Sequence, residues 1–263
     1  MPLYTDQLNH IIQLDNPPKR IVSLVPSQTE LLYDLGLGNE IAGITRFCVH
    51  PRNAFTPKMR VGGTKSVKTD LVRQLQPDLI IANKEENVKD QVEELRRDYP
   101  VWTSDINNLE DAYDMMTAIG HLTGTEPEAA QIIDTIKAGF AQLSPAAVPP
   151  HRTAYLVWQN PFMTIGGDTF IHDMLQRCGF INIFAHHLRY PEITPEELQA
   201  AQCDLLLLPS EPFPFKEKHV KEWEQRLPDA KVLLTDGEMF SWYGSRLLLA
   251  PEYFRRLQEQ LLA

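Results

Sequence analysis

Short apolar runs alternate with amphipathic stretches along most of this chain. The runs IVSLV (21–25), DLIIA (78–82) and DLLLL (204–208) have the length of buried strands. The stretches TDLVRQLQ (69–76) and ENVKDQVEELRRD (86–98) instead place their apolar residues at helical spacing. Strands that alternate with helices favour a mostly parallel sheet flanked by helices, so the pattern predicts an α/β fold.

The second half of the chain repeats the plan of the first half. The strand TAYLVW (153–158) leads to the helix IHDMLQRC (171–178), and the predicted strand DLLLL corresponds to DLIIA of the first half. Later, KVLLTDG (231–237) corresponds to VWTSD (101–105). Each half therefore predicts one Rossmann-like lobe.

One long helix is expected between the two halves, from Thr125 to about Leu143, before the breaker SPAAVPP (144–150). An uninterrupted helix would make a stiff connector rather than a flexible linker. The predicted domains are an N-terminal α/β lobe at 1–123, the connecting helix and linker at 124–150, and a C-terminal α/β lobe at 151–263.

Local signals refine the ends of several elements. SQTE (27–30) and TPEE (194–197) have the spacing of capping boxes. Asp168 is expected to be a helix N-cap, and Gly179 to end that helix in the left-handed conformation. YTDQLNHIIQL (4–14) predicts a hairpin that turns near Asn9.

Composition narrows the class of protein. The chain has 263 residues, of which 43% are hydrophobic and 23% charged, with a formal net charge of −10. This negative charge argues against a nucleic-acid partner.

The longest apolar runs are shorter than the roughly 20 residues of a membrane span. The cysteines Cys48, Cys178 and Cys203 suit reduced thiols. Without an export signal or lipobox cysteine, the chain as written is expected in the cytoplasm, or on the periplasmic side if a leader is missing.

Candidate binding residues lie in the loops that follow the strands, because α/β proteins bind ligands beyond the carboxyl ends of parallel strands. The set is rich in aromatic residues and holds five cations against the negative net charge, which indicates an anionic ligand with a large flat or apolar body. The opposing interpretation is that these cations pair with nearby acids. The candidates are Ser27, Gln28, Arg46, Phe47, Lys65, Asn83, Lys84, Trp158, Gln159, Phe162, Arg189, Tyr190, Ser210, Phe213, Phe240, Trp242, Tyr243 and Arg246.

Several groups admit two interpretations. Cys48 and His50 could begin a metal site, or be a buried thiol beside a loop histidine. The pair His186 and His187 could ligate a metal or haem iron, although paired loop histidines are more often solvated. The loop 83–87 could turn Lys84 toward the ligand, or be a helix start whose acids complement the dipole.

The FSWYGSR segment (240–246) also admits two interpretations. Its three aromatic residues could belong to a core, but their polar setting favours the ligand side. No catalytic residue, resident cofactor or complete metal site is predicted, since no GxSxG, HExxH or GxGxxG motif occurs.

With these loops identified, the sequence resembles the periplasmic binding proteins whose two lobes are joined by one long helix, the receptors for cobalamin, ferric siderophores and haem that serve ABC importers. The resemblance covers nearly the whole chain and is most similar to the cobalamin-type branch. It is carried by PPKRIVSL, PSQTELLYDLGLG, QPDLIIA, YLVWQNPFMTIGGDTFIHDMLQRCGFINIF and SWYGSRLLLAPEYF.

The resemblance implies a monomeric, non-catalytic binding protein that holds one such small molecule between its lobes. Cobalamin receptors place aromatic side chains where this chain has Lys65 and Asn83. Related proteins dock an ABC permease through one acid on each lobe. The position aligned with the first acid holds Lys89, with Asp90 beside it as the candidate, and Glu224 lies near the second.

Two alternatives remain beside the receptor. One is a cytoplasmic relative that carries or senses a ligand, or that serves as an interaction module without a transporter. The other is an enzyme acting on such a ligand, for which only Cys48 with His50, or His186 with Glu192, could supply the chemistry.

Overall fold

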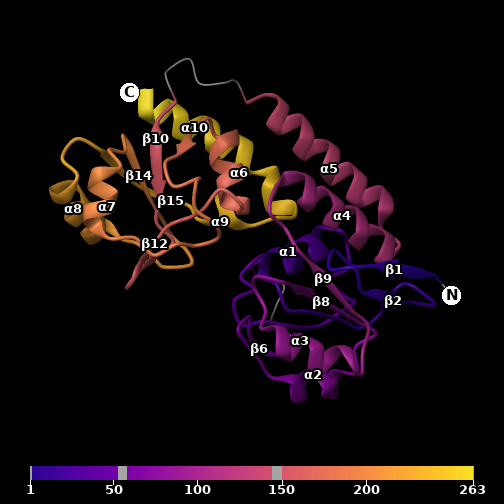
Figure 1. The fold of residues 1–263 in the computed structure, drawn as a ribbon. Coiled ribbons are helices and arrows are strands. Elements are labelled where there is room, and N and C mark those ends of the chain that lie inside the picture. The colour runs from indigo at the N-terminus through magenta and orange to yellow at the C-terminus, as the bar shows by residue number, and fades with distance from the viewer. Residues whose placement is uncertain (1, 53–57, 144–149, 263) are drawn as a thin grey trace. The chain divides into compact units, whose positions relative to one another are not determined.

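The computed structural model describes residues 2–52, 58–143 and 150–262 and confirms the α/β prediction (Figure 1). It contains two compact units, each built on a parallel sheet with flanking helices. Most of the predicted breaker at 144–150 lies outside the described residues. Unit 1 comprises Met1–Ile106, Glu110–Thr135 and Tyr243–Arg246, and unit 2 comprises Asn107–Leu109, Ile136–Trp242 and Leu247–Ala263.

Unit 1 holds a five-stranded parallel sheet. In sheet order its strands are β5 (Met59–Arg60), β4 (Ile41–Ile44), β3 (Ile21–Ser23), β8 (Leu79–Asn83) and β9 (Val101–Ser104). The helices α2 and α3 lie on one side of the sheet and α1 and α4 on the other (Figure 1). These helices are α1 (Pro26–Asp34), α2 (Thr69–Leu75), α3 (Lys89–Arg96) and α4 (Leu109–Thr123), and β6 (Gly62–Gly63) pairs with β7 (Ser66–Val67).

The core of unit 1 follows from the strand pattern. All five residues of β8 are buried, as are all four of β9, because helices cover both faces of the sheet. Val72 of α2 and Leu95 of α3 are fully buried against Val22 and Ile80. The amphipathic spacing that predicted α2 and α3 therefore marks the sides that pack on the sheet.

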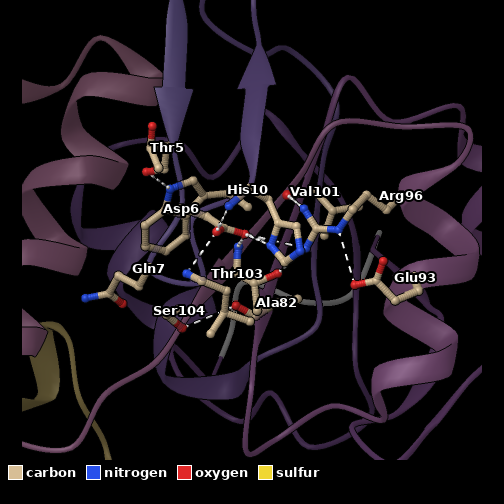
Figure 2. Close-up of polar contacts among 12 residues, drawn as sticks. Thr5, Asp6, Gln7, His10, Ala82, Glu93, Arg96, Val101, Thr103 and Ser104 are labelled. Atoms are coloured by element: carbon tan, nitrogen blue, oxygen red, sulfur yellow. Dashed lines mark hydrogen bonds and ion pairs between the residues drawn. The ribbon is translucent and has the colours of Figure 1, made fainter.

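The N-terminal hairpin, β1 (Leu3–Thr5) and β2 (Ile11–Gln13), is clamped to β9 by Asp6. The Asp6 carboxylate lies 3.1 Å from Nδ1 of His10 and 3.5 Å from the Arg96 guanidinium, and it accepts the Thr103 N–H at 3.3 Å (Figure 2). Arg96 also donates to the Val101 carbonyl at 2.7 Å. The buried acid thus fixes the hairpin turn beside β9, the last strand of the sheet, as a structural clamp.

Unit 2 holds a four-stranded parallel sheet in the order β13 (Ile181–Asn182), β10 (Arg152–Tyr155), β14 (Leu205–Pro209), β15 (Lys231–Thr235). A short hairpin of β11 (Trp158–Gln159) and β12 (Phe162–Met163) follows β10. Helices α7 and α8 lie on one side of the sheet and α6, α9 and α10 on the other (Figure 1). These helices are α6 (Phe170–Arg177), α7 (Pro195–Ala200), α8 (Glu217–Arg226), α9 (Glu238–Ser241) and α10 (Ala250–Leu262), with a 3-10 turn at Ser245–Leu248.

Aromatic rings fill the α9 and α10 side of unit 2. The Phe240 ring lies 5.4 Å from Tyr155 and 4.8 Å from Phe254 between centroids. On the opposite side, Trp223 of α8 packs in a hydrophobic cluster with Leu206 and Leu208. The continuous apolar run of β14 is explained by burial on both faces.

Helix α5 (Glu126–Ala141) contains the division between the two units, which falls between Thr135 and Ile136. The predicted long helix is therefore present, although it ends two residues before Leu143. Among the described residues, none of the helices combines the length and the apolarity needed to cross a membrane.

The local signals have mixed outcomes. Thr194 and Glu197 form the predicted capping box, and Gly179 is left-handed with φ of 80°. The expected capping box at 27–30 is wrong, because α1 begins at Pro26 after Val25 and has no side-chain cap. The N-cap of α6 is Thr169 rather than Asp168, whose carboxylate accepts the Arg189 N–H at 2.6 Å instead.

Candidate functional site

The carboxyl edge of the unit 1 sheet carries a buried network of amide and hydroxyl groups. Asn83, at the end of β8, accepts the Glu85 and Glu86 N–H groups at 2.8 and 2.9 Å and donates to Ser104 Oγ at 3.0 Å. The amide of Gln28 donates to the same Ser104 hydroxyl. These bonds tie the loop after β8 to the end of β9 and to the start of α1.

The network corrects two predicted binding residues. Gln28 is fully buried and Asn83 is 2% exposed, so neither presents its amide to a ligand as expected. Both amides instead donate to the Ser104 hydroxyl inside unit 1, although Gln28 Oε1 is buried without a hydrogen-bond partner among the described residues. Sequence reasoning missed Ser104 and Asn87, which complete the network; Asn87 donates to the carbonyls of Leu24 and Thr64 at 3.2 and 3.1 Å.

Arg46 and Phe47 form an exposed platform at the end of β4. The Arg46 guanidinium carbon lies 4.8 Å from the centroid of the Phe47 ring, and the Phe47 residue is 48% exposed. Gly63 makes this close packing achievable, since a Cβ there would be 3.1 Å from Phe47 Cε2 and 3.3 Å from Arg46 Nε. An exposed ring stacked on a guanidinium offers a flat apolar surface beside a positive charge.

The two predicted lysines at this edge are exposed but engaged. Lys65 donates to the Glu85 carbonyl, and Lys84 lies 2.6 Å from the Asp105 carboxylate. Burial raises the pKa of Glu86, and the charge of Lys65 partly offsets that rise. Because α3 begins only at Lys89, Glu85 and Glu86 belong to the loop and not to a first helical turn.

Arg246 is committed to a carboxylate of unit 1. It is 8% exposed, and its Nε donates to Glu30 Oε2 at 3.0 Å within a two-bonded ion pair. Burial raises the pKa of Glu30, while Arg246 acts to lower it. Arg246 was expected to neutralise a negative charge of the ligand, and in the structure its guanidinium pairs with Glu30, which the sequence had assigned to helix capping.

The aromatic residues of the FSWYGSR segment are buried. Phe240 is fully buried in the unit 2 core, so the expectation that its ring faces a ligand is wrong. Trp242 and Tyr243 are each 7% exposed, and Trp242 Nε1 donates to the Glu211 carboxylate at 2.6 Å. Next to them, Gly244 packs on α1, where a Cβ would lie 3.2 Å from the Ser27 carbonyl. Ser27 itself is 5% exposed at the start of that helix.

In unit 2, the strand-end loops gather an exposed aromatic group around a hollow. Trp158 is 41% exposed and its ring lies 5.6 Å, edge-on, from Phe213. Phe162, half-buried, packs instead on Trp223 with centroids 5.1 Å apart. The adjacent hollow of about 570 Å³ is lined by Gln159, Asn160, Phe213, Pro214, Lys216, Lys218, His219 and Glu222.

His219 sets the chemistry of one wall of this hollow. Its Nδ1 accepts the Lys216 N–H at 2.8 Å, so the other ring nitrogen carries the proton of the neutral form. Burial lowers the pKa of His219, and the charges of Lys218 and Lys216 lower it further, against Glu222. His219 is therefore a helix-start acceptor rather than a titrating group of the hollow.

The loop at residues 183–193, which follows β13, presents side chains from a fixed backbone. Gly166 donates to the Arg189 carbonyl at 2.7 Å, and a Cβ on Gly166 would be 2.5 Å from the His187 carbonyl oxygen. Arg189 reaches Asn107 Oδ1 at 3.2 Å and lies 5.8 Å from the Tyr190 ring. Leu188 is 74% exposed, a contact surface that sequence reasoning missed because a single leucine in a polar loop carries no pattern.

The candidate chemistry at Cys48 is not supported. Cys48 is 1% exposed between the hydroxyls of Thr29 and Thr45, at 3.2 and 3.4 Å, and burial raises the pKa of its thiol. A thiol in this state is a poor nucleophile. In the described parts of the chain, no group of three or more His, Cys, Asp or Glu side chains could hold a metal ion.

The two residues predicted to dock a permease are exposed on helices. Asp90 lies in the first turn of α3 in unit 1, and Glu224 lies on α8 in unit 2. Each unit therefore presents the acid that a docking contact would need, and docking itself stays a prediction.

The sequence and the fold were compared with those of known proteins, and the matches are binding proteins. The sequence profile described as periplasmic binding protein matches residues 21–233. An uncharacterised ABC transporter substrate-binding lipoprotein, YvrC of Bacillus subtilis, is 27% identical over 77% of this chain and 67% of its own length. The vitamin B12-binding protein of Vibrio cholerae is 25% identical over 72% of this chain and 70% of its length. A periplasmic haem-binding protein from Pseudomonas aeruginosa shares the fold, with a TM-score of 0.78, 20% identity and 92% of each chain covered.

Proposed function

The chain belongs to the periplasmic binding protein family, and on this premise we propose that it is a non-catalytic solute receptor for an ABC importer. The matched profile spans both units, from β3 to β15. The relatives are named as binding proteins for vitamin B12 and haem or as transporter lipoproteins, and none of these names supports the alternative of an interaction module. A cobalamin-, haem- or siderophore-like molecule is the ligand class we propose.

The Arg46–Phe47 platform is the single observation that carries this function. Large apolar rings are normally buried, and a 48% exposed ring held on glycine with a guanidinium stacked over it is poorly explained by packing. It lies at the carboxyl end of β4, the edge at which parallel α/β sheets bind ligands. The platform would cover part of a flat ligand and offset one of its negative charges.

In unit 2, we expect ligand contacts at Trp158, at Leu188 and at the hollow beside Phe213. Trp158 and Leu188 are exposed apolar side chains on strand-end loops, which suits a ligand with an apolar body. Lys216 and Lys218 at the hollow would face its acidic substituents. The expected cytoplasmic location stays a prediction, whereas the relatives named here are periplasmic proteins or lipoproteins.

The test is direct binding with a matched pair of variants. We expect the protein purified from its own host to carry a visible absorbance band, or to bind cyanocobalamin, haemin or a ferric hydroxamate in calorimetric titration. Phe47→Ala should weaken binding roughly tenfold, about 1.4 kcal/mol, by removing the stacking surface. The control Ile11→Ala removes a side chain of a similarly exposed residue (66%) from the N-terminal hairpin and should leave affinity unchanged.

A protein that binds none of these solutes would overturn the proposal. Equal affinities for Phe47→Ala, Ile11→Ala and the unmodified chain would leave solute binding standing but remove the platform from it.

A further inference from the structure

The outer edge of β1, in the N-terminal hairpin of unit 1, carries unpaired backbone groups. In the hairpin register the Asp6 N–H donates to the His10 carbonyl at 2.8 Å. Bonded and non-bonded pairs alternate along an antiparallel ladder, so Leu3 and Thr5 turn their N–H and C=O groups away from β2. The Thr5 carbonyl accepts the Trp102 indole N–H at 3.4 Å. Within the described residues, the Leu3 N–H, the Leu3 carbonyl and the Thr5 N–H have no partner.

A groove of about 360 Å³ borders this edge, beside helices α4 and α5 (Figure 1). All of its lining residues belong to unit 1, and most are apolar or aromatic: Leu3, Tyr4, Thr5, Trp102, Ala118, His121, Leu122 and Glu126. Leu3 is 65% exposed, whereas exposed strand edges are usually protected by charges or proline. An unpaired strand edge beside an apolar groove is the arrangement by which proteins bind an extended peptide as an added strand.

The two helices beside the groove determine which charge an added strand should carry. Residues 109–135 include six acidic side chains and neither lysine nor arginine. Glu126 lines the groove and lies 3.5 Å from Nδ1 of His121, while Glu110, Asp114 and Glu128 are exposed on the same helices. This surface would attract a cationic segment and repel an acidic one.

A second copy of this chain suits the groove less well. A copy docked through its own β1 would carry the same acidic helices to the contact, and each chain has a formal net charge of −10. Like charges brought together in this way oppose association. The charge therefore favours a basic segment of another protein over self-association.

We propose that the edge of β1 and the bordering groove bind an extended, basic peptide segment of a partner protein by strand addition. The backbone of the segment would pair with the outward groups of Leu3 and Thr5. Alternate side chains of the segment would enter the groove, where apolar residues suit the lining, and lysine or arginine residues between them would lie near Glu126. The inference goes beyond the solute-receptor function and does not depend on it, because no residue of the groove belongs to the proposed solute site.

The test measures the binding of a fluorescein-labelled peptide, Lys-Val-Lys-Val-Lys-Val-Lys, by fluorescence anisotropy. We expect saturable binding that weakens as salt is added, because the lysines face acidic side chains. Thr5→Pro should weaken binding about fivefold to tenfold, because proline removes an outward N–H that pairs with the peptide. Ile11→Pro is the matched control: Ile11 lies opposite Thr5 and turns its N–H away from β1, so affinity should stay unchanged.

A second measurement needs no variant and therefore stands even if Thr5→Pro does not fold. The peptide is methylated at the backbone nitrogens of its valines or, separately, of its lysines, which blocks one edge of the added strand at a time. One of the two methylated peptides should bind the unmodified protein at least about fivefold more weakly than the other.

The charge of the surface is tested separately. The peptide with glutamate in place of lysine should not bind. Glu126→Gln should weaken binding of the lysine peptide about two- to threefold. Glu196→Gln, which removes an exposed acid of α7 in unit 2, should leave it unchanged.

Three results would overturn the proposal. Equal affinity of Thr5→Pro, Ile11→Pro and the unmodified chain, together with equal binding of both methylated peptides, would mean that the peptide senses net charge alone. Equal binding of the glutamate peptide would remove the basic partner. A dimer that sediments as such and that Thr5→Pro dissociates would make a second copy the occupant. Since no solute is used, each of these results leaves the proposed receptor function standing.

Discussion

At the carboxyl edge of the unit 1 sheet, the amides of Gln28 and Asn83 point inward and tie neighbouring loops together. At the same edge of unit 2, the 183–193 loop is held by backbone bonds to Gly166 and Gly167, and the side chains at 185–188 are exposed. When a loop is held in place by hydrogen bonds of its own side chains, few of those side chains remain to contact a ligand. When a loop is held by backbone hydrogen bonds, its side chains stay available. The comparison therefore identifies unit 2 as the unit with more side chains available for recognition.

The largest expected effect separates core aromatic residues from surface ones. Phe240→Ala should destabilise the protein by about 3–5 kcal/mol, because it removes a fully buried ring from the unit 2 core. Phe47→Ala should change stability by less than about 0.5 kcal/mol, because its ring is half exposed. Urea denaturation of both variants checks this contrast, and an unchanged midpoint for Phe240→Ala would contradict the core assignment.

The next effect concerns the ion pair of unit 1. Arg246→Met should reduce the free energy of unfolding by about 3 kcal/mol at pH 8, because it leaves the Glu30 carboxylate partly buried without its counter-charge. Burial already raises the pKa of Glu30, and losing Arg246 removes the main group that lowers it. The folded variant therefore holds the Glu30 proton more tightly than the unfolded chain, and its stability should recover as the pH falls.

Thermal melts of Arg246→Met at pH 8 and at pH 5 measure this recovery. Adding Glu30→Gln to Arg246→Met should restore most of the lost stability at pH 8, since the unpaired charge is then gone. A double variant no more stable than the single one would show that the pair is not coupled.

A smaller effect tests the hydrogen bonds by which the Asn83 side chain holds the loop after β8. Asn83→Ala should destabilise the protein by about 2 kcal/mol, because the Glu85 and Glu86 N–H groups lose their acceptor. Trp158→Ala, at the edge of unit 2, should change the denaturation midpoint much less, and similar losses for both alanine variants would erase the contrast between the two edges.

The smallest effect is a pH dependence in unit 2. The pKa of His219 is lowered from its ordinary value of 6.5, mainly by burial. Below pH 6.5 the unfolded chain therefore takes up a proton that the folded histidine resists, so stability falls as the pH falls. His219→Asn keeps an acceptor for the Lys216 N–H, and between pH 7.5 and 5 it should lose on the order of 0.5 kcal/mol less than the unmodified protein.

The spacing of apolar and polar residues predicted the strands and helices well, because residues close together in the sequence determine these elements. The apolar runs of β8 and β14 and the helical spacing of α3 match the structure to within a few residues. The capping box at Thr194 is also local, since both of its partners lie within one turn. The same signal failed at Ser27, where Glu30 binds Arg246, a partner 216 positions away that no short window can show.

The candidate site was harder to predict for a related reason. A polar residue after a strand marks the edge of the sheet, but its neighbours in space decide whether it turns inward. Asn83 and Lys84 are adjacent, yet Asn83 is buried and Lys84 is exposed. Likewise, the aromatic residues of FSWYGSR have polar neighbours in the sequence but are buried, Phe240 and Trp242 belonging to unit 2 and Tyr243 to unit 1.

The contact between Arg246 and Glu30 also has a consequence for the synthesis of the chain. Unit 1 takes its residues 243–246 from near the end of the sequence, after most of unit 2. A ribosome makes Glu30 early and Arg246 only 216 residues later, so the nascent unit 1 carries an unneutralised acid at the site of its missing segment. Folding of the first unit therefore finishes only after most of the second has been translated, and a truncated messenger that ends after the first unit would yield an incomplete one.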